Sequence, residues 1–302
     1  MTMTAAPVAP APPELVRTWI LAARLPTLPA AAVPVLAGSG AAQAAGDLSI
    51  AVLLVALAAA LLIQIGTNFA NDVFDFERGA DTDERLGPPR VTHSGLLTPR
   101  DVRLGAAVTF GAAALLGLYL AWVGGWPILV IGAASIVAGL AYTGGPWPFG
   151  YHGLGDVFVF VFFGLVAVCG TYYLHTGDVS GLSLAAGSAV GLLITAILVV
   201  NNLRDRLTDE RSGKRTLAVR LGDRATRAQY AVLVAKTYAI VAGMAIASSW
   251  WLLLPLASLP LAVRVAASIV NGTEGRALNL TLKGTARLAL VFGVLLAAGF
   301  VL

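Results

Sequence analysis

Six of the sixteen acidic side chains in this 302-residue chain fall within residues 68–90, NFANDVFDFERGADTDERLGPPR. The segment directly follows an apolar run that is long enough to enter a lipid bilayer. Asn71 and Asp75 are four residues apart, so a continuing helix would place them on one face, with Asp72 three residues before Asp75. Carboxylates gathered at one site repel one another unless a cation neutralises them. The segment therefore predicts a cation site at the end of a hydrophobic helix.

A second cluster of the same kind lies about 130 residues further on, in VVNNLRDRLTDERSGKRT. Asp205 and Asp209 are again four residues apart, and Asn201 and Asn202 precede them by about one helical turn. One acidic loop between membrane helices is usually just solvated. Two clusters with the same pattern favour a shared site, whereas Asp83 and Glu84 are expected to be ordinary solvated loop residues.

The chemistry that these residues favour is the binding of a diphosphate between two Mg²⁺ ions. Mg²⁺ usually binds through one or two carboxylates plus substrate phosphates. Arginine offers phosphate two parallel hydrogen bonds, and lysine offers it a compact charge. The expected metal ligands are Asn71, Asp72, Asp75, Asp81, Asp205 and Asp209. The expected diphosphate-binding residues are Arg90, Lys214, Arg215, Asn68 and Asn202.

The composition places these motifs in an integral membrane protein. The chain is 58% hydrophobic and 12% charged, with a mean hydropathy of +0.82, whereas soluble proteins contain about 25% charged residues. Its partners are expected to be a lipid bilayer and small-molecule substrates, with no nucleic acid. The single cysteine, Cys169, lies in an apolar run and is expected to be a buried structural thiol. Residues 1–13 are expected to be a disordered tail, and residues 14–302 a single transmembrane domain.

Nine apolar segments predict an all-α membrane bundle of nine helices, because a transmembrane helix needs roughly 20 apolar residues. Lys and Arg gather on every second connection, while the connections QAAGDLS, VGGWP, HTGDVSG and IASSW have none. Positively charged connections face the cytoplasm, so the N-terminus and both acid clusters are expected on the cytoplasmic side of a bacterial cell membrane. The nine segments are 19–42, 48–70, 103–123, 127–143, 155–175, 182–201, 229–247, 249–270 and 285–302.

The two motifs together resemble those of the UbiA superfamily of intramembrane prenyltransferases. NDVFDFERGAD is similar to the first aspartate motif of that family, and DRLTD is similar to the second. RLPTLPAAAVPVLAGSGAA, LGPPRVTHSGLLTPRDV and AYTGGPWPFGYHGLGDVFVFVFFG are similar to the branch that prenylates 1,4-dihydroxy-2-naphthoate in menaquinone synthesis. Many superfamily members have a further Asp where this chain has Gly79, and the Gly-x-Asp form with Asp81 is that of the naphthoate branch.

This resemblance implies nine helices around a central cavity that opens sideways to lipid. It implies Mg²⁺-assisted loss of diphosphate from an allylic polyprenyl diphosphate. The allylic cation would then replace the carboxylate of the naphthoate ring, giving demethylmenaquinone, CO₂ and diphosphate. Another acceptor, such as 4-hydroxybenzoate, homogentisate or a glycerol phosphate lipid, remains an alternative. A cation transporter is a further alternative, although basic residues beside the acids would repel a permeating cation.

A final set of residues is expected to contact the acceptor or to stabilise the allylic cation. Aromatic faces attract cations, and a carboxylate inside a membrane segment is functional by default. One or two side chains of the run Phe158–Phe163 are expected in a tunnel for the prenyl chain. The candidates for the acceptor or the cation are Tyr142, Tyr151, Asp156 and Arg24.

Overall fold

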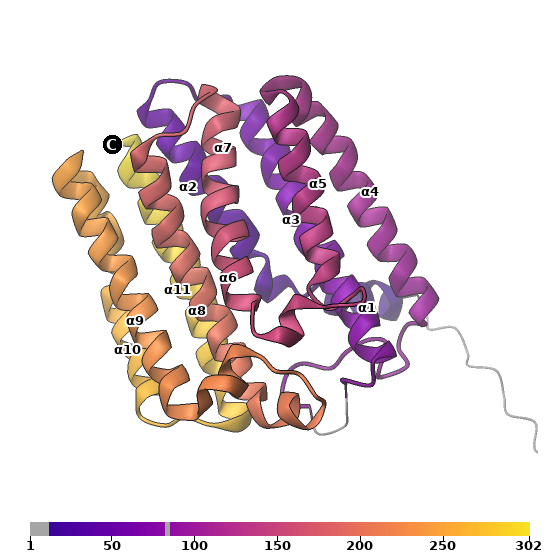
Figure 1. The fold of residues 1–302 in the computed structure, drawn as a ribbon. Coiled ribbons are helices and arrows are strands. Elements are labelled where there is room, and N and C mark those ends of the chain that lie inside the picture. Colours follow the sequence, from indigo (N-terminus) through magenta and orange to yellow (C-terminus); the bar gives the residue numbers. More distant parts are fainter. Residues whose placement is uncertain (1–11, 82–84) are drawn as a thin grey trace, which may run out of the picture.

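The computed structural model describes residues 12–81 and 85–302, and within these ranges it contains helices and no strand (Figure 1). Most of the expected tail, and Asp83 and Glu84, lie outside the described residues. The main helices are α1 (Pro12–Ala23), α2 (Pro29–Ala44), α3 (Ile50–Glu77), α4 (Pro99–Gly124), α5 (Trp126–Ala141), α6 (Gly155–Val159), α7 (Ala167–Thr176), α8 (Gly181–Arg211), α9 (Leu217–Ala247), α10 (Leu259–Val270) and α11 (Leu278–Val301). The shorter helical pieces are η1 (Leu25–Thr27), η2 (Phe149–His152), η3 (Phe160–Val166), η4 (Trp250–Ser258) and η5 (Gly275–Ala277).

The all-α membrane class is confirmed, but the number of nine spans is not. In the described part of the chain, seven helices or helix runs are long and apolar enough to cross a membrane. The pair α1 and α2 would make an eighth span, bent by 51°. The predicted segment 127–143 forms α5, which has 16 residues and is shorter than a full span.

The first predicted helix is broken at Arg24 rather than continuous over 19–42. Arg24 has φ 52°, in the left-handed region, and a short η1 turn follows it. Pro26 and Pro29 explain the break, because proline lacks an N–H and clashes with the preceding helical turn. The side chain of Arg24 thereby reaches the inside of the bundle at a bend.

Both acid motifs belong to long helices that continue past the predicted ends. α3 runs to Glu77 and α8 to Arg211, so the motifs occupy the last turns of these helices. Ser49 caps the start of α3, and Ser180 forms a capping box with Ser183 at the start of α8. Figure 1 shows the connections after α3 and after α8 at the same end of the bundle. The expectation that both clusters share one face is confirmed by this arrangement.

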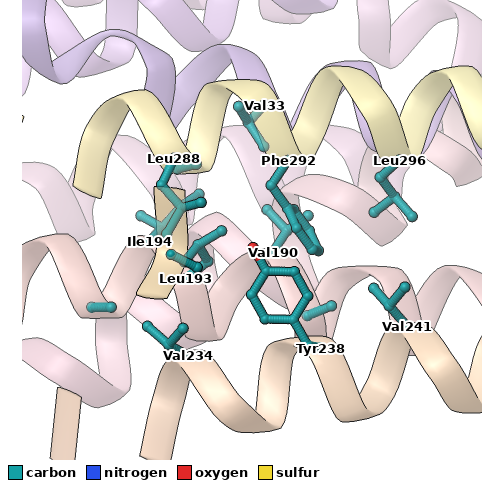
Figure 2. Close-up of a cluster of buried hydrophobic side chains, with 14 of the residues drawn as sticks. Val33, Val190, Leu193, Ile194, Val234, Tyr238, Val241, Leu288, Phe292 and Leu296 are labelled. Atoms are coloured by element: carbon teal, nitrogen blue, oxygen red, sulfur yellow. The ribbon is translucent and has the colours of Figure 1, made fainter. Parts of the chain in front are cut away.

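The core that holds α8 in place is built from α2, α9 and α11 (Figure 2). Leu193, Phe292 and Leu296 are at most 1% exposed, and Tyr238 packs edge-on against Phe292 with ring centroids 5.8 Å apart. Small residues let the helices approach closely, as is usual where lipid gives no hydrophobic drive between helices. A Cβ on Gly293, for example, would lie 2.4 Å from Val33. This half of the bundle is therefore a rigid wall behind the second acid motif.

Candidate active site

The two acid motifs face each other across a cavity of about 340 Å³ at one end of the bundle. Asn71 and Asp75 reach it from α3, and Asp205 and Asp209 reach it from α8. Its polar lining also includes Arg24, Gln64, Arg85, Arg90, Tyr142, Thr143, Tyr151, Asn201, Asn202, Thr208 and Lys214. Each of the two helices thus contributes both carboxylate and amide groups to the cavity, and basic side chains from the connections complete its polar lining.

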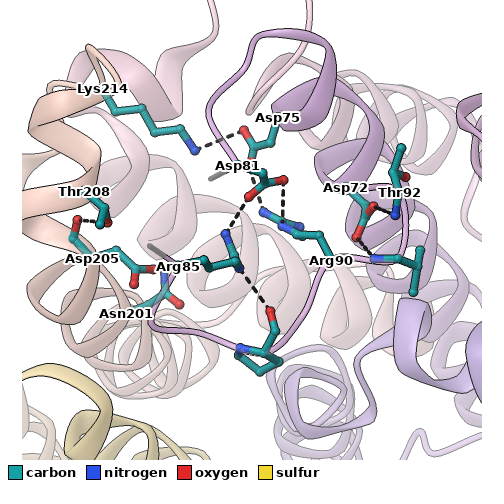
Figure 3. Close-up of polar contacts among 12 residues, drawn as sticks. Asp72, Asp75, Asp81, Arg85, Arg90, Thr92, Asn201, Asp205, Thr208 and Lys214 are labelled. Atoms are coloured by element: carbon teal, nitrogen blue, oxygen red, sulfur yellow. Dashed lines mark hydrogen bonds and ion pairs between the residues drawn. The ribbon is translucent and has the colours of Figure 1, made fainter. Parts of the chain in front are cut away.

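Asp75 is the centre of this site. Its carboxylate is buried and accepts hydrogen bonds from Arg90 Nη2 at 2.6 Å and Tyr151 Oη at 2.7 Å. It also accepts from Lys214 Nζ at 3.1 Å (Figure 3). The three donors come from three different connections. Burial and the neighbouring Asp75 carboxylate together raise the pKa of Tyr151, which keeps its phenol protonated as a donor. One side chain of α3 therefore holds together the loops that cover the cavity.

Asp81 forms a second acidic point in the connection after α3. Arg85 Nη1 donates to Asp81 Oδ1 at 2.7 Å, and Arg90 Nε lies 3.4 Å from Asp81 Oδ2. Burial raises the pKa of Asp81 to about 6, against the nearby Arg85 guanidinium, which lowers it. The side chain lies beside the cavity rather than among the residues that line it. Direct metal ligation by Asp81 stays a prediction.

Asp72 points away from the cavity and holds a loop instead. Its two carboxylate oxygens accept from the backbone N–H groups of Val91, at 3.3 Å, and Thr92, at 3.0 Å (Figure 3). Arg24 Nη2 is 3.8 Å from the same carboxylate. These contacts fix the chain immediately after Arg90. The geometry thus gives Asp72 a positioning role for Arg90, and its role as a metal ligand stays a prediction.

Arg204 was not predicted from the sequence, yet it organises the second motif. Its guanidinium donates to both oxygens of Asp205, at 2.8 and 2.5 Å, and to Asn201 Oδ1 at 2.9 Å. Arg204 Nη1 also donates to Asn279 Oδ1 at 2.8 Å, and Asn279 Nδ2 donates to the carbonyl of Leu86 at 2.9 Å. The network ties α8, α11 and the first-motif loop together. Asn279 lies 193 residues from Leu86, so no local pattern pointed to it.

The remaining predicted binding residues divide between the cavity and its supports. Asn71 Oδ1 accepts from Thr143 Oγ1 at 2.7 Å, and Asn202 lines the cavity on α8. Asn68 lies outside the lining, because its amide donates to Ala23 O and Thr27 Oγ1, both at 2.9 Å. The Arg215 side chain is exposed and is not part of the lining.

The four candidate acceptor residues do not share one place. Arg24, Tyr142 and Tyr151 all line the cavity, and burial raises the pKa of Tyr142. Asp156 does not line it: Gln229 Nε2 donates to Asp156 Oδ2 at 2.6 Å, which holds the carboxylate against α9. Its contacts therefore favour a structural role.

The unpaired buried atoms at the site fit a diphosphate and hard cations. Among the described residues, Arg90 Nη1 has no hydrogen-bond acceptor, while Arg90 Nε and Asp81 Oδ2 make no hydrogen bond and contact each other only as an ion pair at 3.4 Å. The available ligands are carboxylate and amide oxygens, the set that suits Mg²⁺. No three acidic, His or Cys side chains within the described ranges gather tightly enough to cage an ion alone. Mg²⁺ does not require such a cage, because substrate phosphates commonly complete its coordination.

A second cavity of about 500 Å³ continues from the first into the apolar part of the bundle. It is lined by residues of α2, α3, α4, α5, η3 and α7, nearly all of them apolar. Ala60, Ile63, Ser135, Phe162 and Ala167 line both cavities. The whole space therefore has one charged end and one apolar end.

Comparison with known proteins gives the same architecture. The UbiA prenyltransferase family matches residues 31–285. A 1,4-dihydroxy-2-naphthoate octaprenyltransferase of Mycobacterium tuberculosis is 43% identical, over 92% of this chain and 95% of that protein. The Escherichia coli protein of the same name is 35% identical, over 95% of this chain and 96% of that protein.

Solved structures share the fold at low sequence identity. A UbiA homolog from Archaeoglobus fulgidus, bound to DMAPP and Mg²⁺, has a TM-score of 0.69 at 13% identity, covering 94% of this chain and 99% of that one. A UbiA homolog from Aeropyrum pernix has a TM-score of 0.68 at 17% identity, covering 90% and 96%. The match covers most of the chain and agrees with the two facing acid motifs, so this chain belongs to the UbiA prenyltransferase family.

Proposed function

We propose that this protein transfers a polyprenyl group from an allylic polyprenyl diphosphate to 1,4-dihydroxy-2-naphthoate, releasing diphosphate and CO₂. One observation carries the proposal: a charged cavity with acids from two helices opens into an apolar cavity. That polarity matches a donor with a diphosphate at one end and a hydrocarbon chain at the other. The names of the relatives supply the acceptor and make octaprenyl diphosphate the first donor to test.

The cavity residues would divide the work between the diphosphate and the metal. Asn71 and Asp75 on one wall, and Asp205 and Asp209 on the other, would hold two Mg²⁺ ions. Bound Mg²⁺ would neutralise the charge that develops on the leaving diphosphate. Arg90 would offer its unpaired Nη1 to a phosphate oxygen, and Lys214 would add a positive charge from the opposite loop.

The bond changes balance without a further reactant. The C–O bond of the donor breaks, and its electron pair leaves with the diphosphate. The ring carbon that bears the carboxylate then bonds to the allylic carbon. The bond from that ring carbon to the carboxylate breaks, CO₂ leaves, and the electron pair returns to the ring. The immediate product is demethylmenaquinone in its reduced, quinol form.

Aromatic side chains of this protein would stabilise the allylic cation and shield it from water. Tyr142, Phe149 and Phe158 line the charged cavity near its apolar neighbour. Aromatic faces attract cations by about 0.5–2 kcal/mol, more where water is excluded. A dry apolar wall also keeps water from capturing the allylic cation. Arg24, at the bend between α1 and α2, would face the carboxylate of the acceptor.

A product assay tests the acceptor and the reaction together. Purified protein in lipid would be supplied with Mg²⁺, octaprenyl diphosphate and 1,4-dihydroxy-2-naphthoate, and the lipid products would be read by mass spectrometry. Octaprenyl naphthoquinol and an equal amount of CO₂ are expected. Prenylation of 4-hydroxybenzoate or homogentisate in a parallel screen, with none of the naphthoate, would show that the acceptor is wrong. Chelation of Mg²⁺ should stop the reaction.

A further inference from the structure

We call the residues that line both cavities the neck: Ala60, Ile63, Ser135, Phe162 and Ala167. Of the five residues that line both cavities, four are aliphatic or small, and the fifth is Phe162. Ser135 uses its hydroxyl on the carbonyl of Ile131, at 2.8 Å, so it offers the neck no free donor. A chain that passes from the charged cavity into the apolar one would therefore run beside the Phe162 ring.

The backbone at Phe162 has an unusual form that sets where this ring lies. Residues Phe160–Val166 form η3, a π-helical segment between α6 and α7. Such wide turns are rare and often occur at functional sites, because they shift the side chains of one turn relative to a regular helix. In Figure 1 the run from α6 to α7 stands between α8 and the group of α3 and α5. The segment thus separates the rigid core from the apolar cavity.

Close packing against α8 holds η3 in this position. A Cβ on Gly164 would lie 2.6 Å from Gly187 O and 2.6 Å from Gly191 Cα. A Cβ on Gly191 would in turn lie 2.9 Å from Phe160 O. Because backbone meets backbone here, η3 has no room to move toward α8. The Phe162 ring is therefore presented to the neck from a fixed wall.

A series of aromatic rings leads from the charged cavity to the neck. The Tyr142 and Phe149 ring centroids are 5.4 Å apart, and those of Phe149 and Phe158 are 3.8 Å apart. Phe158 and Phe162 follow, with centroids 6.0 Å apart and planes within 9°. All four rings line the charged cavity, and Phe162 alone of them also lines the apolar one. The rings form a continuous apolar track that ends at the neck.

We propose that Phe162 is a specificity-determining residue, which controls the passage of the donor's prenyl chain into the apolar cavity and thereby the preference for long donors. The inference rests on the proposed function. A short chain such as geranyl would stay beside the four rings in the charged cavity. A long chain would have to cross the neck and fill the space between α3, α4 and α5. Discrimination between donors would then depend on the width of the neck.

The test compares donors of different length in two variants of the neck. Phe162→Trp should lower kcat/KM for octaprenyl diphosphate relative to geranyl diphosphate by roughly tenfold or more, since a few atoms in an apolar pocket change such ratios by about 10–200-fold. Phe162→Leu should keep octaprenyl transfer and allow bulkier chains. If wild type does not turn over geranyl diphosphate, its inhibition of octaprenyl transfer gives its binding. An unchanged donor ratio in an active Phe162→Trp variant would overturn the proposal.

Two further variants control the interpretation. Val157→Trp adds the same ring to the same run of helix at a side chain that is 57% exposed, and it should leave the donor ratio at the wild-type value. Gly132→Phe fills the wall of the apolar cavity, where a Cβ meets nothing within 4 Å, and it should also select against octaprenyl. If Gly132→Phe has no such effect, the chain leaves by another route and the neck is not a gate. A wild type that transfers no donor at all would refute the proposed function instead.

Discussion

At the scale of single residues, the site depends most on Asp75, which joins three loops through three hydrogen bonds. We predict that Asp75→Asn lowers turnover by roughly 100-fold or more, as the loss of one strong electrostatic contact in a catalytic site does. The amide keeps the shape of the side chain but loses its charge toward Mg²⁺. Turnover and thermal unfolding in detergent would be measured together, so that lost activity is not confused with lost folding.

The control for this variant is another aspartate near the same face. Asp101 forms a capping box with Thr98 at the start of α4 and does not line the cavity. Asp101→Asn should keep wild-type turnover and lose about 1 kcal/mol of stability or less. Near-normal turnover in Asp75→Asn would contradict the central role of this carboxylate. Equal losses in both variants would point to general destabilisation instead.

Asp72 gives a second prediction at this scale, because it could act as a metal ligand or as an anchor for the loop after Arg90. A metal ligand and a loop anchor respond differently to the same change. Since Asp72 accepts from the backbone of Val91 and Thr92, we expect Asp72→Asn to raise the KM for the prenyl diphosphate by loosening Arg90. The Mg²⁺ concentration for half-maximal rate should stay at the wild-type value. A Mg²⁺ titration of initial rates decides between the two roles, and a large increase in the Mg²⁺ requirement would identify Asp72 as a metal ligand.

At the scale of elements, both cavities are lined in part by η3, and η3 is held in place by its close packing against α8. Gly191→Ala puts a methyl group 2.9 Å from Gly164 Cα, where backbone leaves no space to yield. We predict a loss of about 1–3 kcal/mol in stability, the usual effect of overpacking. Gly243→Ala is the matched control on α9, because a Cβ there meets nothing within 4 Å. In detergent, the Tm of Gly191→Ala should be lower than that of wild type, and the Tm of Gly243→Ala should equal or exceed it.

The same scale explains how much could be predicted from the sequence. Spacing along one helix was sufficient to place Asn71 and Asp75 together, and the recurrence of the pattern led to Asp205 and Asp209. Spacing could not say that the chain after Arg90 folds back onto Asp72, or that Gln229 meets Asp156. These contacts depend on how separate elements pack. Arg204 and Asn279 were missed for the same reason, since their partners lie far apart in sequence.

At the scale of the whole molecule, basic residues gather at one end of the bundle, whereas exposed tryptophans occur at both ends, Trp147 among them at the acid-motif end. The large exposed tryptophans Trp122, Trp126 and Trp250 lie at helix ends on the side away from the acid motifs. Tryptophan is enriched at membrane interfaces, and Lys and Arg are enriched in cytoplasmic connections. Tryptophan marks an interface on either side, so the Lys and Arg bias alone predicts the orientation. We predict that the active-site connections and the N-terminus face the cytoplasm.

This orientation predicts the labelling of single cysteines in intact cells. Cys169 is buried, and Cys169→Ala would provide the background. Asp178→Cys, in the connection between α7 and α8, should react with a maleimide that does not cross membranes, because this exposed site would face outward. Glu210→Cys, exposed at the far end of α8, should react only after the cells are opened. The two positions lie at opposite ends of one helix of 31 residues, which rises about 1.5 Å per residue and is therefore long enough to cross the bilayer. Labelling of Glu210→Cys in sealed cells, with Asp178→Cys protected, would reverse the orientation and place the diphosphate site outside the cytoplasm.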